Sequence, residues 1–586
     1  MKTTLFPLPR VRFADLLETM RPAGSALIGS LFLLALAGPA HGASGAWSKS
    51  GNGDWGDPLN WTGGVPNGTG ESATFNGSGY TVDLSGVSGG VTVGRLEVAD
   101  GVTPTWLLTG GGLTLAASSP GTPVISNEGT MLQIASILAG TQGFTKEGTG
   151  RLYLSNTGNS ITGDVTINGG SLLVSGASVL NGNKIILGGS GTSTFLISGT
   201  GNYQNDTVLN ASTNSISSAN NTNATYSGTI SELGGSRDLT LYVNGGTATI
   251  TVSGDNSYTG NTAIGSASAT LRAVITNDNA LGLGTDATVY LHDNSSDLLN
   301  ALVLKGGIHV TGKNFILKGR GIGQEGSLVS SDGENIWEGN LSLGTGKVTD
   351  YAATIGVDED SVLTVKGVIS NPVAQTQGLA KVGLGTLILD GENTYTTGTL
   401  VSEGTLVVNG SLAKQGAVLV SSGATLAVGG KIGGNTSIAS GGRLTGGADA
   451  GELRFESDLH LAAGSQAILR FVTDEGSLSH DWLQVEGTLT LSLGGTLEVD
   501  AAGLSSSHIG QVYTLAAWDE LVAGGFDVDT DLVFVNLDPS LTILTDNFLV
   551  NGTVTVIPEP GTVALLFGAA CLLGGPLLRK RRAARV

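Results

Sequence analysis

The chain has 586 residues and carries 28 Lys and Arg against 48 Asp and Glu, which gives a formal net charge of −20. Such an acidic surface repels nucleic acid and anionic lipid, so both are excluded as partners of the body of the protein. The only cysteine is Cys571, which excludes an internal disulfide and a Cys-based metal cluster.

Residue composition favours an all-β fold. Glycine accounts for 94 residues and proline for 14, while 40% of the residues are hydrophobic and 13% are charged. Many glycines among β-branched residues indicate short strands joined by tight turns, and the apolar content is too high for a disordered chain. Alternation of period two recurs, as at 249–252 and 488–491, and no helical period is sustained between the two ends. Helices should therefore be few.

Residues 1–42 have the organisation of a signal peptide. A basic start with Lys2 and Arg10 precedes the apolar run 26–37, and small residues follow at Ala40-His41-Gly42. We expect export through the Sec pathway and cleavage by signal peptidase, for which Ala40 and Gly42 supply the small side chains. A buried N-terminal helix is the alternative, but the composition changes as soon as the apolar run ends.

Three tryptophans stand near the start of the predicted N-terminal segment, 43–125. Trp47, Trp55 and Trp61 lie in a stretch rich in Gly and Asn. We favour a cap over the first strands, because the open end of a stacked β fold has bare strand edges that need covering. The alternative is an exposed platform on which sugars stack.

A repeated motif occupies the predicted central region, 126–445. Residues 143–176 read GFTKEGTGRLYLSNTGNSITGDVTINGGSLLVSG, and residues 378–410 read GLAKVGLGTLILDGENTYTTGTLVSEGTLVVNG, so that Lys146 matches Lys381. A degenerate third copy lies within 235–275 and lacks the lysine. The common form is KxGxGxLxL, followed by NxYTG and GxLxV.

This form resembles the autotransporter-associated β-strand repeat. The resemblance implies a right-handed parallel β-helix, the pectin-lyase-like solenoid of autotransporter passengers. The physics of the unit agrees, because a rung of about 20–25 residues cannot bury its apolar row alone and has to stack on its neighbours. Further rungs are expected over 446–556. Asn156, Asn256 and Asn393 are predicted to stack and cap turn amides.

The C-terminal segment, 557–586, combines three features. Pro558-Glu559-Pro560 is followed by the apolar run 561–578, and a basic cluster comes next. The cluster consists of Arg579, Lys580, Arg581 and Arg582. About 18 apolar residues just reach across a hydrocarbon core, and the basic cluster holds the end in the cytoplasm.

In this order the three features resemble the PEP-CTERM sorting signal of Gram-negative bacteria. The resemblance implies a transient anchor in the inner membrane through the C-terminal helix. It also implies cleavage near Pro558-Glu559-Pro560 by an exosortase-type membrane protease, which releases the protein or leaves it at the cell surface. An ordinary single-pass anchor is the alternative.

Patterns that point to catalysis or metal binding are weak. The histidines lack zinc-site spacing, and the consecutive Ser479-His480-Asp481 alternate faces on a strand, so they cannot converge as a triad. Asp527, Asp529 and Asp531 imitate the start of a calcium loop, but we interpret them as the solvent face of a strand through 528–532. No catalytic residue, cofactor site or metal site is therefore predicted.

Together these patterns predict a non-enzymatic exported protein of the cell surface or extracellular matrix. We expect a role in adhesion or biofilm, with extracellular polysaccharide as a partner. The alternative is a carbohydrate-active β-helix enzyme, a polysaccharide lyase or hydrolase, since solenoids host both classes. Against the enzyme, cleavage of a uronate polymer generally uses a cluster of Lys or Arg beside carboxylates, and the basic residues of this chain are few.

Overall fold

The computed structural model describes residues 44–266, 269–292, 300–344, 353–372 and 378–559. The predicted signal peptide, with Ala40 and Gly42, lies outside these ranges. So does the predicted membrane span at 561–578.

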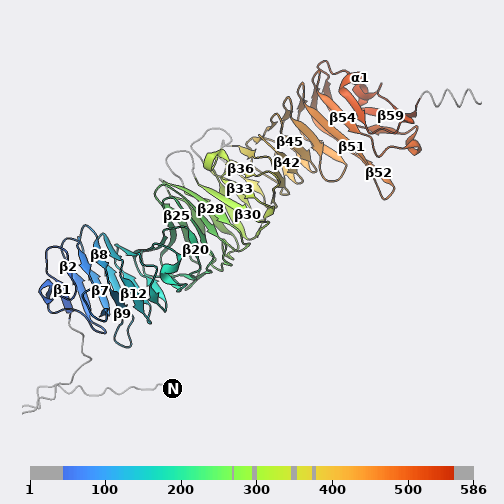
Figure 1. Ribbon diagram of the computed structural model, residues 1–586. Helices are drawn as coiled ribbons and strands as arrows, with labels where there is room; N and C mark the ends of the chain where they lie inside the picture. The colour runs from blue at the N-terminus through green and yellow to red at the C-terminus, as the bar shows by residue number, and fades with distance from the viewer. Residues whose placement is uncertain (1–43, 267–268, 293–299, 345–352, 373–377, 560–586) are drawn as a thin grey trace, which may run out of the picture. The chain divides into compact units, whose positions relative to one another are not determined.

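The described chain winds into a right-handed parallel β-solenoid, which confirms the predicted all-β fold. Five sheets, of 10, 14, 4, 17 and 11 strands, are built from strands that belong to successive turns of the chain. In one of these sheets β4 (Ser72–Phe75) lies between β1 (Ser44–Trp47) and β7 (Arg95–Val98), and Figure 1 shows β1 and β7 in blue. Among the described residues, the α-helices are α1 (Val528–Asp531) and α2 (Phe548–Asn551), each a single turn.

Alternation along each strand places one row of side chains in a common core. Leu132, Leu152 and Leu172 stack in register on neighbouring strands, and all three are fully buried. Along each strand, the residues that alternate with the buried ones, such as Tyr153, point outwards and remain partly exposed. The strands that matter below belong to the 14-stranded sheet: β11 (Met131–Ile134), β14 (Arg151–Leu154), β17 (Gly170–Val174), β19 (Thr192–Ile197), β22 (Thr213–Ala219) and β25 (Leu239–Asn244).

Tryptophans close the N-terminal turns. Trp47, Trp55 and Trp61 are only 4%, 0% and 6% exposed, and the rings of the last two meet edge to face at 4.9 Å. Strand β3 (Trp61–Thr62) folds back antiparallel on β1 and covers its edge. These contacts confirm the cap. The alternative of a sugar-stacking platform is wrong, because the ring faces are buried.

The last turns differ from the rungs expected throughout 446–556. Strands β55 (Val512–Thr514), β59 (Thr553–Pro558) and β58 (Leu541–Leu544) form an antiparallel sheet, with β59 in the middle. The parallel stack itself continues to β57 (Leu532–Val535), which pairs with β54 (Thr496–Asp500).

The strand interpretation of 528–532 is wrong for 528–531, which form α1, whereas Leu532 begins strand β57. Asp527 is its N-cap, and its carboxylate accepts the backbone N–H of Asp529 at 3.0 Å. The Asp531 carboxylate is buried and accepts the N–H of Gly494, on the preceding turn of the solenoid, at 3.2 Å. Asp527 thus caps the helix, and Asp531 joins the helix to the preceding turn.

A buried lysine joins two turns in each complete repeat. Lys146 and Lys381 are fully buried. Lys146 Nζ donates to the carbonyls of Glu147, Gly148 and Gly169 at 2.7–3.0 Å, the last of these on the next turn. Lys381 donates to three carbonyls at the corresponding positions. Desolvation by burial lowers the pKa of both ammonium groups to about 8.

An asparagine of the NxYTG motif joins three turns. Asn393 Oδ1 accepts the N–H of Ile369 at 2.8 Å on the preceding turn, and its Nδ2 donates to Ser411 O at 3.0 Å on the following one. Asn256, in the degenerate copy, makes the same two kinds of bond at 2.7 Å. Both side chains are buried, so the predicted capping role is confirmed for them.

In the first repeat Asn156 caps a turn as predicted, since its Oδ1 accepts Gly158 N at 2.8 Å and its Nδ2 donates to Ala135 O at 2.9 Å, but a second asparagine takes the buried position that joins three turns. Asn159, not Asn156, accepts from Leu138 N at 2.8 Å and donates to Val179 O at 3.2 Å. The connection between the LxL pair and the asparagine is one residue longer in this copy than in 378–410, which moves the buried position along the chain.

Replacing Asn159 with alanine is expected to lower the unfolding free energy by about 2–3 kcal/mol, because it leaves a buried donor and a buried acceptor unpaired. Asn156→Ala is the matched control and should cost less than about 1 kcal/mol, since Asn156 is partly exposed to water. Urea unfolding compares the two variants. Equal destabilisation by the two substitutions would contradict the assignment of the buried, turn-joining role to Asn159.

Candidate ligand-contacting face

Hydroxyl side chains form a row on the outer face of the 14-stranded sheet. The register places Ser171 beside Thr194, Thr194 beside Ser215, and Ser215 beside Thr240. Arg151 stands next to Ser171 at the start of the row. Neighbouring strands lie ~4.8 Å apart, so hydroxyl residues recur at that spacing over four strands. Ser171 and Thr240 are partly exposed, whereas Thr194 and Ser215 are buried.

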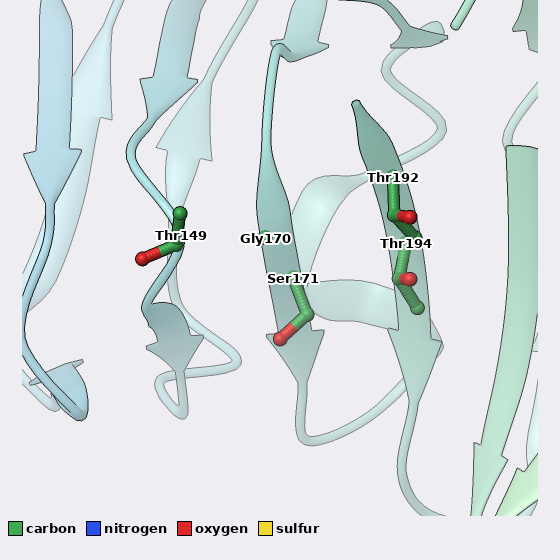
Figure 2. Close-up of a pocket in the computed structure, with 5 residues that line it drawn as sticks. All are labelled: Thr149, Gly170, Ser171, Thr192 and Thr194. Atoms are coloured by element: carbon green, nitrogen blue, oxygen red, sulfur yellow. The ribbon is translucent and has the colours of Figure 1, made fainter. Parts of the chain in front are cut away.

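Two adjoining depressions, which we call the hydroxyl groove, lie over the start of this row. The first has a volume of about 380 Å³, and Figure 2 shows its lining residues on neighbouring segments: Thr149, Gly170, Ser171, Thr192 and Thr194. The second, also of about 380 Å³, shares Thr149 and Ser171 with the first. It adds Thr130, Met131, Gly150 and Arg151.

Neutral hydroxyls dominate the groove, with one charge of each sign at its edge. Arg151 Nε donates to Ser171 Oγ at 3.3 Å. The N–H and hydroxyl of Thr149 donate to the Glu128 carboxylate at 3.1 and 3.3 Å. This donor and acceptor set matches a hydroxylated ligand, which can exchange hydrogen bonds with the row one group at a time.

Gly170 keeps the floor of the groove open. Its φ of 62° lies in the left-handed region, and a Cβ there would meet the carbonyl oxygens of Gly148, Thr149 and Gly150 at 2.6–2.8 Å. A side chain at this position would therefore push the turn apart.

Ser479, His480 and Asp481 do not form one site, as predicted from strand alternation. Asp481 is fully buried against Arg470, with Oδ2 at 2.7 Å from Nε. His480 Nε2 lies 3.0 Å from the carbonyl oxygen of Thr514, and Ser479 Oγ donates to the carbonyl oxygen of Val472. Within the described ranges, no group of three or more His, Cys, Asp or Glu could hold a metal ion.

The predicted sorting residues fall at and beyond the end of the described chain. Pro558 is the last residue of β59 and pairs with Leu541, and the N–H of Glu559 donates to Ser540 O at 2.8 Å. Pro560, Arg579, Lys580, Arg581 and Arg582 lie outside the described residues. No helix in the described part of the chain is both long enough and apolar enough to cross a membrane.

Sequence reasoning named none of the residues in the hydroxyl groove. Ser171 and Thr194 occupy outward positions in alternating strands, and that signal was visible. Which outward residues become neighbours depends on the length of each turn, and those lengths vary from copy to copy.

The fold and the groove define a class: a repeat-built parallel β-solenoid with a polar outer face suited to contact. Residues 144–174 and 379–408 match the Passenger-associated-transport-repeat family, which confirms the two complete repeats. The chain is also similar to the Adhesin BmaC autotransporter of Brucella suis biovar 1 (strain 1330), with 34% identity over 147 residues. That match covers 24% of this chain and 4% of the relative, so the chain spans a small part of that protein's length.

Proposed function

We propose that the protein is a non-enzymatic, exported adhesin of the cell surface or extracellular matrix, which contacts extracellular polysaccharide through the hydroxyl groove. The accessible hydroxyls of Thr149, Ser171 and Thr192 carry the proposal, because they lie on neighbouring segments and line one groove. The similarity of part of the chain to an autotransporter adhesin supports the same function.

Repetition makes weak contacts sufficient for adhesion. One neutral hydrogen bond contributes only about 0.5–1.5 kcal/mol, but a polymer lying in the hydroxyl groove makes several at once. Once the first contact holds the chain, each later one forms at a high effective concentration. Such binding requires no nucleophile, metal or general base.

The test is adherence of cells that export the full chain to surfaces coated with a neutral polysaccharide. A variant with Thr149→Val, Ser171→Ala and Thr192→Val is expected to bind about tenfold or more weakly, because three hydroxyls are lost. The matched control replaces Thr364 and Thr445, outward residues of the 11-stranded sheet, with valine. Unchanged adherence of the triple variant, or equal loss in the control, would refute the proposed role of the groove. Polysaccharide turnover by the purified chain would refute the non-enzymatic assignment.

We further propose that the C-terminal segment is a sorting signal of the PEP-CTERM type. In this scheme the basic cluster and the apolar run hold the protein transiently in the inner membrane, and an exosortase-type protease cuts near Pro558-Glu559-Pro560. The order of Pro558-Glu559-Pro560, the apolar run 561–578 and the basic cluster supports it.

Replacing Pro558, Glu559 and Pro560 with alanine is expected to leave uncut protein in the inner membrane. Mass spectrometry of surface-released wild-type protein checks the site of cleavage. A C-terminus near Pro560 supports processing, whereas one that still extends through Cys571 identifies an ordinary anchor instead.

A further inference from the structure

A second depression, which we call the valine groove, lies on the outer face of the 17-stranded sheet. Its volume is about 350 Å³, and its lining comprises Thr251, Arg272, Val274, Thr276, Val303, Lys305 and Ser331. These residues lie on or beside four neighbouring strands: β26 (Thr247–Val252), β28 (Thr270–Ile275), β30 (Ala301–Lys305) and β33 (Leu328–Ser331).

Val274 and Val303 line this groove and, with Val329, form an apolar cluster outside the main core. Val274, Val303 and Val329 pair in register across β28, β30 and β33, and are 9%, 2% and 1% exposed. They form a hydrophobic cluster separate from the main core, because they point outwards while Ala273 and Leu302 point inwards.

A carboxylate already reaches one of the cations of this groove. Residues 319–326, which we call the strap, cross the outer face, and Glu325 Oε2 lies 3.1 Å from Arg272 Nη1. The strap is seated on Gly356, where a Cβ would stand 1.8 Å from the Glu325 carbonyl oxygen. Arg272 therefore recognises a carboxylate presented above the valine cluster, while Lys305 on the neighbouring strand is exposed.

We propose that the valine groove binds an acidic sugar residue of a polysaccharide, a uronate. Arg272 receives the carboxylate by displacing Glu325, Lys305 at the other end of the groove adds positive charge, and Val274, the most exposed of the three valines, contacts the C–H face of the ring. The hydroxyls of Thr251, Thr276 and Ser331 exchange hydrogen bonds with those of the sugar. The inference rests on the proposed polysaccharide-contacting function and assigns acidic sugars to this second face.

An acidic peptide fits this face less well than a sugar. The backbone groups of β26, β28, β30 and β33 are paired in parallel ladders from strand to strand, so they cannot pair with an added strand. A peptide would leave its own N–H and C=O groups without backbone partners above the valine cluster. A sugar carries hydroxyls that the threonine and serine side chains can satisfy.

The test is titration of the purified full-length chain with a galacturonate oligosaccharide, its carboxyl-reduced neutral counterpart, and an oligoglutamate peptide. The galacturonate oligomer is expected to bind at least about tenfold more tightly than either comparison ligand, and R272Q/K305Q should remove about tenfold or more of that affinity. E325Q should tighten binding by about threefold to fivefold, because it removes the competing carboxylate. Circular dichroism verifies that each variant folds.

The variant with Thr364→Val and Thr445→Val, outward residues of the 11-stranded sheet that line neither groove, is the matched control and should leave galacturonate binding unchanged. Equal affinity for the neutral oligomer, no loss in R272Q/K305Q, or binding of oligoglutamate as tight as that of galacturonate would overturn the inference. Absence of galacturonate binding in a chain that still mediates adherence to neutral polysaccharide overturns it too, and leaves the proposed function standing. The proposed adhesin function is refuted only if the wild-type chain fails to mediate adherence to neutral polysaccharide.

Discussion

Replacing Asp481 with alanine is expected to destabilise the C-terminal turns by about 3–5 kcal/mol, because it leaves a largely buried arginine without its counter-charge. The Asp481 carboxylate is fully buried and accepts four N–H groups: Arg470 N at 3.0 Å, Arg470 Nε at 2.7 Å, Arg470 Nη2 at 3.3 Å and Gly451 N at 3.0 Å. It thereby closes the base of the hairpin formed by β51 (Gln466–Asp474) and β52 (Ser477–His480). Figure 1 shows β52 beside β51 at that end of the body.

Hydrogen exchange of the amides in β51 and β53 (Trp482–Leu491) measures this local loss of stability. Asp474→Ala, at the exposed tip of the same hairpin, is the control and should change stability by less than about 0.5 kcal/mol. The double variant with Arg470→Ala and Asp481→Ala should be more stable than Asp481→Ala alone, because the unpaired charge is gone. If the double variant is the less stable of the two, the buried charge is not the cause.

Most of the solenoid was predictable because its determinants are local. The LxL pairs specify which residues point inwards, and the stacking of Leu152 on Leu132 and Leu172 follows from repeating that pattern. The tryptophan cap was predictable for a similar reason, since an open strand edge needs apolar cover wherever a solenoid begins.

Errors arose where a contact with a distant residue decided the outcome. The alternating aspartates from Asp527 to Asp531 have the period of a strand, yet the bond from Asp531 to Gly494 stabilises a helical turn. Asn156 and Asn159 both follow the LxL pair of the first repeat. The length of the connection after that pair determines which of the two is buried.

Neither groove was predictable, because each one depends on which outward residues of different turns become neighbours. Val274 and Val303 are 29 positions apart in the chain, whereas Ser171 and Thr194 are 23 apart, and both pairs lie side by side. Turns of unequal length remove any fixed spacing that a sequence pattern could reveal. The surface chemistry of a solenoid is therefore less visible in the sequence than its core.

The buried lysines of the two complete repeats are expected to make the protein more stable as the pH rises from 8 to about 10. The pKa of Lys146 and that of Lys381 are lowered by burial to about 8, from an ordinary value of 10.5. Between those two values the unfolded chain holds more protons than the folded one, and the unfolding free energy increases with pH wherever that is so. Below pH 8 both states are protonated, so these lysines contribute no slope there.

The expected rise is about 1–3 kcal/mol per lysine, because one pKa unit corresponds to 1.36 kcal/mol and the three carbonyl acceptors oppose loss of the proton. Urea unfolding between pH 7 and 10 measures it, with the variant Lys146→Met and Lys381→Met as the comparison. The range stops at pH 10 because burial raises the pKa of Tyr203 to about 12. Above pH 10 the unfolded chain ionises that phenol first, which reverses the slope. A wild-type chain whose stability follows that of the double variant throughout this range would show that the carbonyls hold both ammonium groups fully charged.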